Sequence, residues 1–238
     1  MNEKIGESIP VYFLLSIIII ISVFLLRSLF QPVCPPLDAF ETAVSSARKI
    51  VIDPGHGGKD GGAVSLTGTH EKHLNLCVAF DMTELLHALG YEVILTRDSD
   101  IELTHPDGGT RKMQDLKGRL EIAQSNPGAF FVSIHMNKFA EEKYSGLQVY
   151  YSPNDNKSRI LADSVQETVR HRLQKDNDRA VKKATSDIFL LDKISSPAIL
   201  IECGFISNQS ESKLLDTPEY RRKLSYTIVT AVINAFER

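Results

Sequence analysis

Short, mostly apolar runs alternate along the chain, from Lys49 onward, with longer segments whose apolar residues recur at helical spacing. The runs are typical of β-strands and read KIVID, YEVILTR, FFVSIH, GLQVYY, IFLL and PAILIE. A period of about 3.6 residues predicts helices over 71–89, 116–124, 158–173 and 218–236. Strands that are apolar throughout are covered by helices on both faces. The pattern therefore predicts one α/β domain of three layers around a mainly parallel or mixed sheet.

An uninterrupted apolar segment precedes this domain. Residues 11–26 contain no charge and only two serines, which predicts an N-terminal apolar helix. Its length suits a membrane anchor or the apolar part of a signal peptide, and we favour an uncleaved anchor because no small-x-small cleavage pattern follows. We assign residues 1–30 to the anchor or signal peptide, 31–48 to a proline-containing linker and 49–238 to the folded domain, which we expect to be exported.

Charge and cysteine content exclude several classes of protein. The first 47 residues hold two basic and four acidic residues, which leaves 25 basic and 26 acidic residues in the remainder of the chain, from Arg48 onward. A domain this close to neutral offers no broad basic surface, so nucleic acid is not an expected partner. The three cysteines, Cys34, Cys77 and Cys203, form no CxxC pair. They are too few and too scattered for a disulfide framework or a thiolate zinc site.

Polar side chains that could bind a ligand or take part in catalysis lie at the ends of three predicted strands. His56 follows KIVID, His135 ends FFVSIH and Glu202 ends PAILIE. In open α/β sheets, ligands bind beyond the carboxyl ends of the strands. We therefore expect these three side chains to meet at one edge of the sheet.

The two histidines together with acidic residues favour a metal site. A hydrolytic zinc site has three His or carboxylate ligands and one open position. Glu71 fits the third position beside His56 and His135, because it lies in the first turn of the helix that leaves the His56 loop. Glu202 ends a buried strand, where a carboxylate is costly unless it is paired or functional. We expect Glu202 to act as a general base with a pKa raised by burial, with a structural ion pair as the alternative.

The glycine-rich turn 53–62 also allows a phosphate-binding interpretation, because backbone N–H groups before a helix attract anions. The phosphate-loop pattern needs Ser or Thr after its lysine, but Asp60 follows Lys59. The favoured interpretation is that the glycines let the backbone turn sharply and project His56 into the site.

Two further motifs have alternative interpretations. Cys203 could be a nucleophile with His135 as its base, although thiol hydrolases usually place that cysteine at a helix start. His70 and His73 bracket Glu71 in a sequence one residue short of HExxH. We expect both of these histidines at the surface, at the start of a helix.

The same motifs carry a family resemblance. IVIDPGHGGKDGGA, the following Glu71, LTR at 95–97, FVSIHMN, GLQVYY and PAILIECGFISN resemble the zinc-dependent N-acetylmuramoyl-L-alanine amidases that trim bacterial cell walls. The resemblance runs from about Lys49 to the C-terminus. It implies that His56, Glu71 and His135 bind zinc and that Glu202 is the catalytic glutamate, in agreement with the assignment from the residues. Met136 and Ala180 stand where the family commonly has Ala and Gly.

The compact layout is most similar to the germination-specific amidases of spore formers. This similarity implies hydrolysis of the amide between the muramic acid lactyl group and L-alanine of peptidoglycan during spore cortex maturation. The implied partners are peptidoglycan strands with stem peptides, the membrane through the N-terminal helix, an activator protein and a downstream muramic acid deacetylase that closes the δ-lactam. Three alternatives stay open: a vegetative amidase of cell separation, a glycosidase with two carboxylates, and a non-catalytic wall-binding protein.

Overall fold

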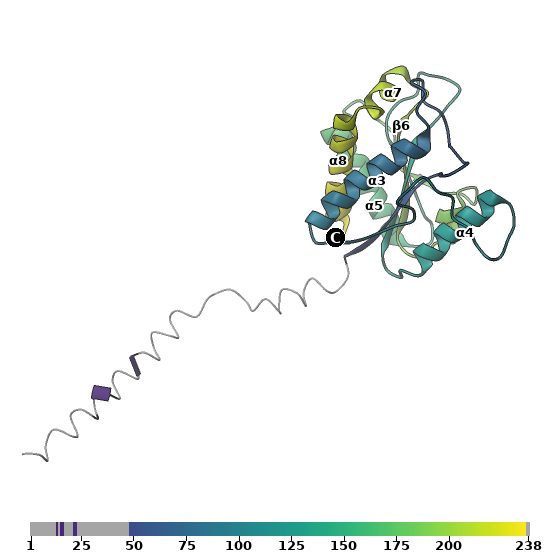
Figure 1. Cartoon of the computed structure of the whole chain (residues 1–238). Helices are drawn as coiled ribbons and strands as arrows, with labels where there is room; N and C mark the ends of the chain where they lie inside the picture. Colours follow the sequence, from purple (N-terminus) through teal and green to yellow (C-terminus); the bar gives the residue numbers. More distant parts are fainter. Residues whose placement is uncertain (1–12, 14, 17–20, 23–47, 237–238) are drawn as a thin grey trace, which may run out of the picture. The chain divides into compact units, whose positions relative to one another are not determined.

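The computed structural model describes residues 48–236 together with Phe13, Leu15, Ser16, Ile21 and Ser22 (Figure 1). A six-stranded mixed sheet of order β2-β1-β3-β6-β4-β5 forms its centre. The strands are β1 (Lys49–Pro54), β2 (Glu92–Leu95), β3 (Phe130–Asn137), β4 (Gln148–Tyr151), β5 (Lys182–Lys183) and β6 (Ala198–Phe205). All neighbouring strands pair in parallel except β4 and β6, which are antiparallel.

Helices cover both faces of this sheet, which confirms the predicted three-layer α/β domain. They are α3 (Glu71–Ala88), α4 (Arg111–Gln124), α5 (Asn156–Arg172), α6 (Phe189–Lys193), α7 (Gln209–Leu215) and α8 (Pro218–Phe236). Figure 1 shows α3, α5 and α8 gathered on one side of the strands and α4 on the other. The helix α6 packs with α4 and against β6.

Side chains alternate along the strands between two separate cores. In β1, Ile50 and Ile52 join the larger core with α3, α5 and α8, whereas Val51 joins a smaller core with α4 and α6. We call the side of the larger core the apolar face and the side of the smaller core the site face. Asp53 and His135 alternate with the strand residues of the larger core and so project on the site face.

Most predicted elements are present, with differences at polar ends. The helix α4 begins at Arg111 rather than 116, because Thr110 caps it by accepting a hydrogen bond from the backbone N–H of Met113. The first turn of α4 is polar, so the apolar period gave no signal there. The short helix α7 was not predicted. Asn208 caps it by accepting from the N–H groups of Ser210 and Glu211.

The prediction of a strand at IFLL is wrong. Phe189–Lys193 forms the helix α6, which buries Leu190 and Leu191 in the smaller core. Four consecutive apolar residues have no period of their own, so a buried helical turn and a buried strand look alike in the sequence. The strand position beside β4 is taken instead by the two-residue β5.

The predicted N-terminal anchor and linker, including Cys34, lie almost entirely outside the described residues. Among the described residues, no helix combines the length and apolar character needed to cross a membrane.

Candidate metal and catalytic site

The turn after β1 presents His56 in an unusual backbone conformation. His56 has a φ of 61°, in the left-handed region that non-glycine residues seldom adopt. Gly55, just before it, has no room for a side chain, because a Cβ there would lie 2.2 Å from Nε2 of His135. Glycine thus lets the His135 ring from β3 pack directly on the turn. The His56 and His135 rings meet edge to face, with centroids 4.9 Å apart.

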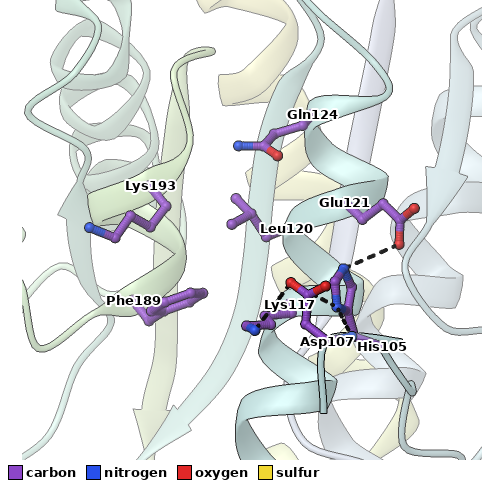
Figure 2. Close-up of a pocket in the computed structure, with 8 residues that line it drawn as sticks. All are labelled: His105, Asp107, Lys117, Leu120, Glu121, Gln124, Phe189 and Lys193. Carbon is purple, nitrogen blue, oxygen red and sulfur yellow. Dashed lines mark hydrogen bonds and ion pairs between the residues drawn. The ribbon is translucent and has the colours of Figure 1, made fainter. Parts of the chain in front are cut away.

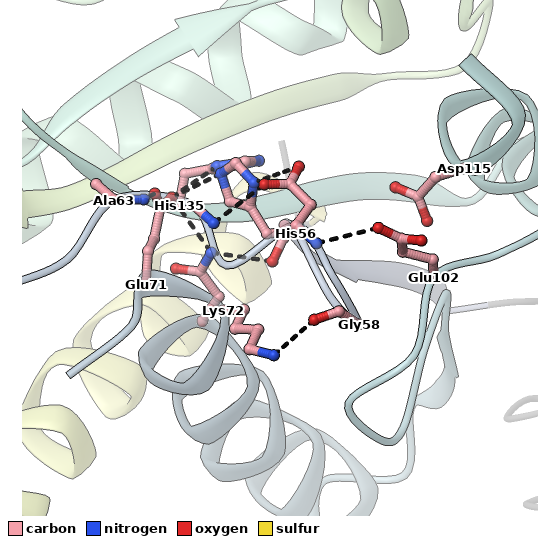
Figure 3. Close-up of polar contacts among 12 residues, drawn as sticks. His56, Gly58, Ala63, Glu71, Lys72, Glu102, Asp115 and His135 are labelled. Atoms are coloured by element: carbon pink, nitrogen blue, oxygen red, sulfur yellow. Dashed lines mark hydrogen bonds and ion pairs between the residues drawn. The ribbon is translucent and has the colours of Figure 1, made fainter. Parts of the chain in front are cut away.

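Glu71, the first residue of α3, contacts both imidazoles (Figure 3). Its Oε1 atom is 3.2 Å from Nε2 of His56 and 3.0 Å from Nδ1 of His135. The backbone N–H of Met136 donates to Oε1, and that of Ala63 donates to Oε2. The helix α3 covers the apolar face, but Glu71 is its first residue. Glu71 therefore reaches the histidines at the edge of the sheet.

Asp60 orients the His56 ring from the outer side. Its Oδ2 atom lies 2.9 Å from Nδ1 of His56. A carboxylate only accepts hydrogen bonds, so Nδ1 carries a hydrogen toward Asp60 while Nε2 is directed at Glu71. A carboxylate behind a histidine in this way is the usual support for a metal-binding imidazole.

One ligand atom from each of His56, Glu71 and His135 can be chosen so that all three lie within 4.8 Å of one another. Two imidazole nitrogens and one carboxylate oxygen form a donor set that suits tetrahedral zinc with one position left open. The negative charges around His56 also favour a cation at this position. Burial alone would lower the pKa of His56, but hydrogen bonding to Glu71 and the charges of Glu71 and Asp60 raise it to about 9. The residues present therefore fit a metal ion.

Glu202 stands next to this cluster, directly opposite His135 in the β3–β6 pair. Its side chain is partly exposed, but its Oε2 atom is buried and has no hydrogen-bond partner among the described residues. Burial, assisted by the charge of Glu71 and opposed by that of His135, raises the pKa of Glu202 to about 7. A buried carboxylate oxygen without a partner is costly unless it serves a function. The alternative interpretation, a structural ion pair of Glu202, finds no partner among the described residues.

A buried charge network holds the turn that carries His56. Arg119 of α4 is 2% exposed and donates through Nη1 to Asp53 Oδ1 and to the Pro54 carbonyl, and through Nη2 to the His56 carbonyl. Arg97 donates to the Gly55 carbonyl. These positioning roles were not predicted from the sequence. Two sequence features could have indicated residues that position the His56 turn: a carboxylate at the end of the apolar KIVID run, and Asp60 four residues after His56.

The structure disfavours the phosphate-binding interpretation of the glycine-rich turn. Carboxylates already occupy its backbone donors: Gly58 N–H donates to Asp100 and Asp60 N–H donates to Glu102. Gly62 N–H donates to Asp60 itself. No free N–H cradle of the required kind remains at these three positions.

The structure also disfavours the thiol interpretation. Cys203 is completely buried with the larger core, on the face opposite Glu202, and burial raises the pKa of its thiol. A buried thiol of this kind is inert. His70 and His73 are exposed at the start of α3, as predicted.

A surface hollow of about 410 Å³ lies between α4 and α6, away from these residues (Figure 2). Its polar wall contains His105, whose ring nitrogens lie 3.6 Å from Asp107 and 3.8 Å from Glu121. Lys117 also approaches Asp107, at 3.3 Å. The acidic groups are thus matched by basic ones, and none of the four proposed zinc or base residues lines this hollow.

Comparisons with known proteins agree with the geometry. The chain is 35% identical over 195 residues to the germination-specific N-acetylmuramoyl-L-alanine amidase of Bacillus subtilis, covering 80% of this chain and 81% of that protein. The solved CwlD amidase of Clostridioides difficile, in complex with the GerS lipoprotein, superposes with a TM-score of 0.74 at 38% identity, covering 80% of this chain and 99% of that one. The amidase AmiC2 of Nostoc punctiforme gives a TM-score of 0.70 at 31% identity, with 80% and 97% covered. Residues 50–234 match the N-acetylmuramoyl-L-alanine amidase family along nearly the whole domain, and the chain belongs to that family.

Proposed function

We propose that this amidase hydrolyses the bond between the muramic acid lactyl group and L-alanine of peptidoglycan, with zinc bound by His56, Glu71 and His135 and with Glu202 as general base. The observation that carries the proposal is the buried, unpartnered Oε2 of Glu202 beside a His-Glu-His donor set. A zinc ion in such a set polarises a carbonyl oxygen and lowers the pKa of water.

Within this proposal, the chain's own residues divide the work. Glu202 accepts a proton from the attacking water and returns it to the L-alanine nitrogen as that nitrogen leaves. Asp60 keeps the His56 ring in one orientation, and Arg119 keeps its backbone in place. The products are a lactyl carboxylate on the glycan and a free stem peptide.

Mass spectrometry of muropeptides tests this proposal. Zinc-loaded protein should release peptides that begin with L-alanine, and Glu202→Gln should reduce the rate by roughly 10²- to 10⁴-fold with bound zinc unchanged. Glu167→Gln, on the exposed side of α5, is the matched control and should behave as wild type. A Glu202→Gln variant with full activity would contradict the assigned base. Release of reducing sugars in place of peptides would instead favour a glycosidase, and binding without turnover would favour a wall-binding protein.

We further propose a role in spore cortex maturation, in which a muramic acid deacetylase acts on the exposed lactyl carboxylate to allow δ-lactam closure. The similarity to the germination-specific relative supports this role. A deletion strain of the source organism should make spore cortex without muramic δ-lactam. If the lactam persists and daughter cells fail to separate, the vegetative alternative is correct.

We also infer that the enzyme acts outside the cytoplasmic membrane, with residues 1–30 as anchor or signal peptide, 31–48 as linker and 49–238 as the zinc-dependent catalytic domain. The similar CwlD amidase was solved in complex with a lipoprotein, and this supports our inference that an activator protein binds this chain as well. Fractionation of cells followed by N-terminal sequencing tests the anchor, and measurement of zinc content with and without co-purified proteins tests the activator.

A further inference from the structure

A second hollow, of about 220 Å³, lies beside Glu202 on the site face of the sheet. It is lined by Asn137, Phe139, Tyr144, Gln148, Tyr150, Arg179, Lys182 and Phe205. Gln148 of β4 pairs directly with Glu202 of β6. Residues paired across two strands project on the same face, with Cβ atoms about 5 Å apart. The hollow therefore begins about one strand spacing from the proposed base.

Arg179 is held in this hollow by contacts of both its side chain and its backbone. Its guanidinium carbon lies 4.6 Å from the centroid of the Phe205 ring, and its Nε donates to the Ser145 carbonyl at 2.8 Å. Its own carbonyl accepts a hydrogen bond from Arg170. Stacking and the Nε hydrogen bond hold the guanidinium, and the bond from Arg170 holds the backbone of Arg179. A ligand would therefore meet a preorganised group.

The guanidinium keeps unused donors. Among the described residues, no acidic side chain forms an ion pair with Arg179, and its two Nη atoms have no hydrogen-bond partner. The charge of Arg179 acts on the nearby carboxylate of Glu211, but without an ion pair, and that carboxylate accepts from the backbone N–H groups of Gly146 and Phe205. An Arg fork with two free terminal groups matches a carboxylate in bidentate geometry.

Lys182 adds a second positive charge to the same hollow. Its Nζ lies 5.8 Å from the centroid of the Tyr150 ring, and no acidic side chain of the described part of the chain pairs with it. Tyr150 and Lys182 are themselves paired across β4 and β5. Two cations over aromatic side chains, neither in an ion pair within the described part of the chain, indicate a site for an anion.

We propose that this hollow, the carboxylate subsite, binds the free α-carboxylate of the second stem-peptide residue, with Arg179 as the specificity residue. The inference rests on the proposed function. The carboxyl group of muramic acid is consumed in the scissile amide, so the free carboxylates of the substrate belong to the peptide. A residue spans about 3.5 Å, which places the second residue of the peptide within reach of a group one strand away from Glu202.

Two matched muropeptides test the carboxylate subsite. They are disaccharide tripeptides whose second residue, attached through its side-chain carboxyl, carries either a free α-carboxylate or the amide at that position. Wild type should cleave the carboxylate form with a kcat/KM roughly 10-fold or more above the amide form, as a charge-assisted pair implies. Arg179→Gln should bring the ratio of the two kcat/KM values close to one, through a higher KM for the carboxylate form.

Two variants separate specificity from folding. Arg179→Lys should restore part of the preference, and Lys183→Gln, the exposed neighbour outside the hollow, should keep all of it. Equal losses on both substrates in Arg179→Gln, or a wild type without preference, would overturn the subsite while leaving the amidase proposal intact. Absence of amide cleavage by wild type on both substrates would overturn the proposed function and the subsite together. Calorimetry on Glu202→Gln should show the same preference in binding.

Discussion

The apolar face and the site face of the sheet use the same strands for different purposes. On the apolar face, Ile52, Ile134 and Ile201 pack under three long helices, without a charged strand residue among the buried members of that core. On the site face, the neighbours of these residues along the same strands include Asp53, His135 and Glu202, and only α4 and the five-residue α6 cover the smaller core.

The difference separates stability from chemistry. Burial of apolar area is the main favourable term in folding, and the apolar face supplies most of it. The site face instead buries charges, which cost free energy unless they are paired or used. Asp53 and Arg119 are paired, at 2.6 Å, and position the His56 turn. The buried Oε2 atom of Glu202 has no hydrogen-bond partner within the described part of the chain and lies beside the three proposed ligands.

The largest expected effect is on activity, from a substitution confined to the site face. His135→Ala should lower amide hydrolysis by roughly 10³-fold or more, because it removes one of the three proposed zinc ligands and with it the several kcal/mol that a metal ion contributes. The unfolding free energy of the metal-free protein should change by only about 1 kcal/mol, the value of a lost hydrogen bond. Activity assays, zinc analysis and urea unfolding measure the three quantities.

The matched change on the apolar face is Leu161→Ala, in α5, where the side chain is fully buried. It should cost about 2–5 kcal/mol of unfolding free energy and leave the rate per folded molecule near wild type. A His135→Ala variant that unfolds, or a Leu161→Ala variant that loses zinc while folded, would show that the two faces are not separable.

A smaller effect is expected from Asp60→Asn on the site face. The variant keeps the size of the side chain but removes the charge that orients His56 from 2.9 Å. Zinc affinity should fall roughly 10- to 100-fold, as for other supports of metal-binding histidines. Competition with a chromogenic chelator measures the affinity. Asp163→Asn, which alters a surface ion pair with Arg159 on α5, is the control. Unchanged affinity in Asp60→Asn would restrict Asp60 to a structural role.

The smallest effect concerns acid stability. Burial would raise the pKa of Asp53, but the charge of Arg119 and hydrogen bonds from Thr96, Ser133 and Arg119 outweigh it and hold the pKa below 3.8. As the pH falls, Asp53 therefore binds its proton at a higher pH in the unfolded chain than in the folded one. The contribution of Asp53 is present above its ordinary pKa and is lost as the pH falls through the folded-state value, at about 1.4 kcal/mol per pH unit at most.

Acid unfolding of wild type and Asp53→Asn in metal-free buffer checks this sign. The variant should be less stable at neutral pH and should lose less additional stability below pH 3.8 than wild type does. A steeper acid slope in the variant would mean that Asp53 is not the charged partner of Arg119.

Much of the architecture could be predicted because apolar spacing reports burial directly. The final helix begins and ends at the predicted residues 218 and 236, since it is amphipathic along its length. The start of α4 and all of α7 were missed because polar caps, rather than apolar spacing, determine where they begin. The helix α6 was taken for a strand because tertiary packing of Leu190 and Leu191, and no local period, selects its conformation.

By itself, the sequence determined the three-layer α/β class and the family motifs, because residue type and order are sufficient for these. It also nominated the four side chains that we propose for zinc and base roles. The tertiary structure alone decided what surrounds them. It showed that Arg119 and Arg97 hold the His56 turn, that Asp60 orients the ring, and that Glu202 keeps a buried oxygen without a partner. It also brought Arg179 to a hollow beside Glu202 from a loop before β5. These contacts join residues distant in the chain, and their energies depend on distance and burial, which only the folded molecule defines.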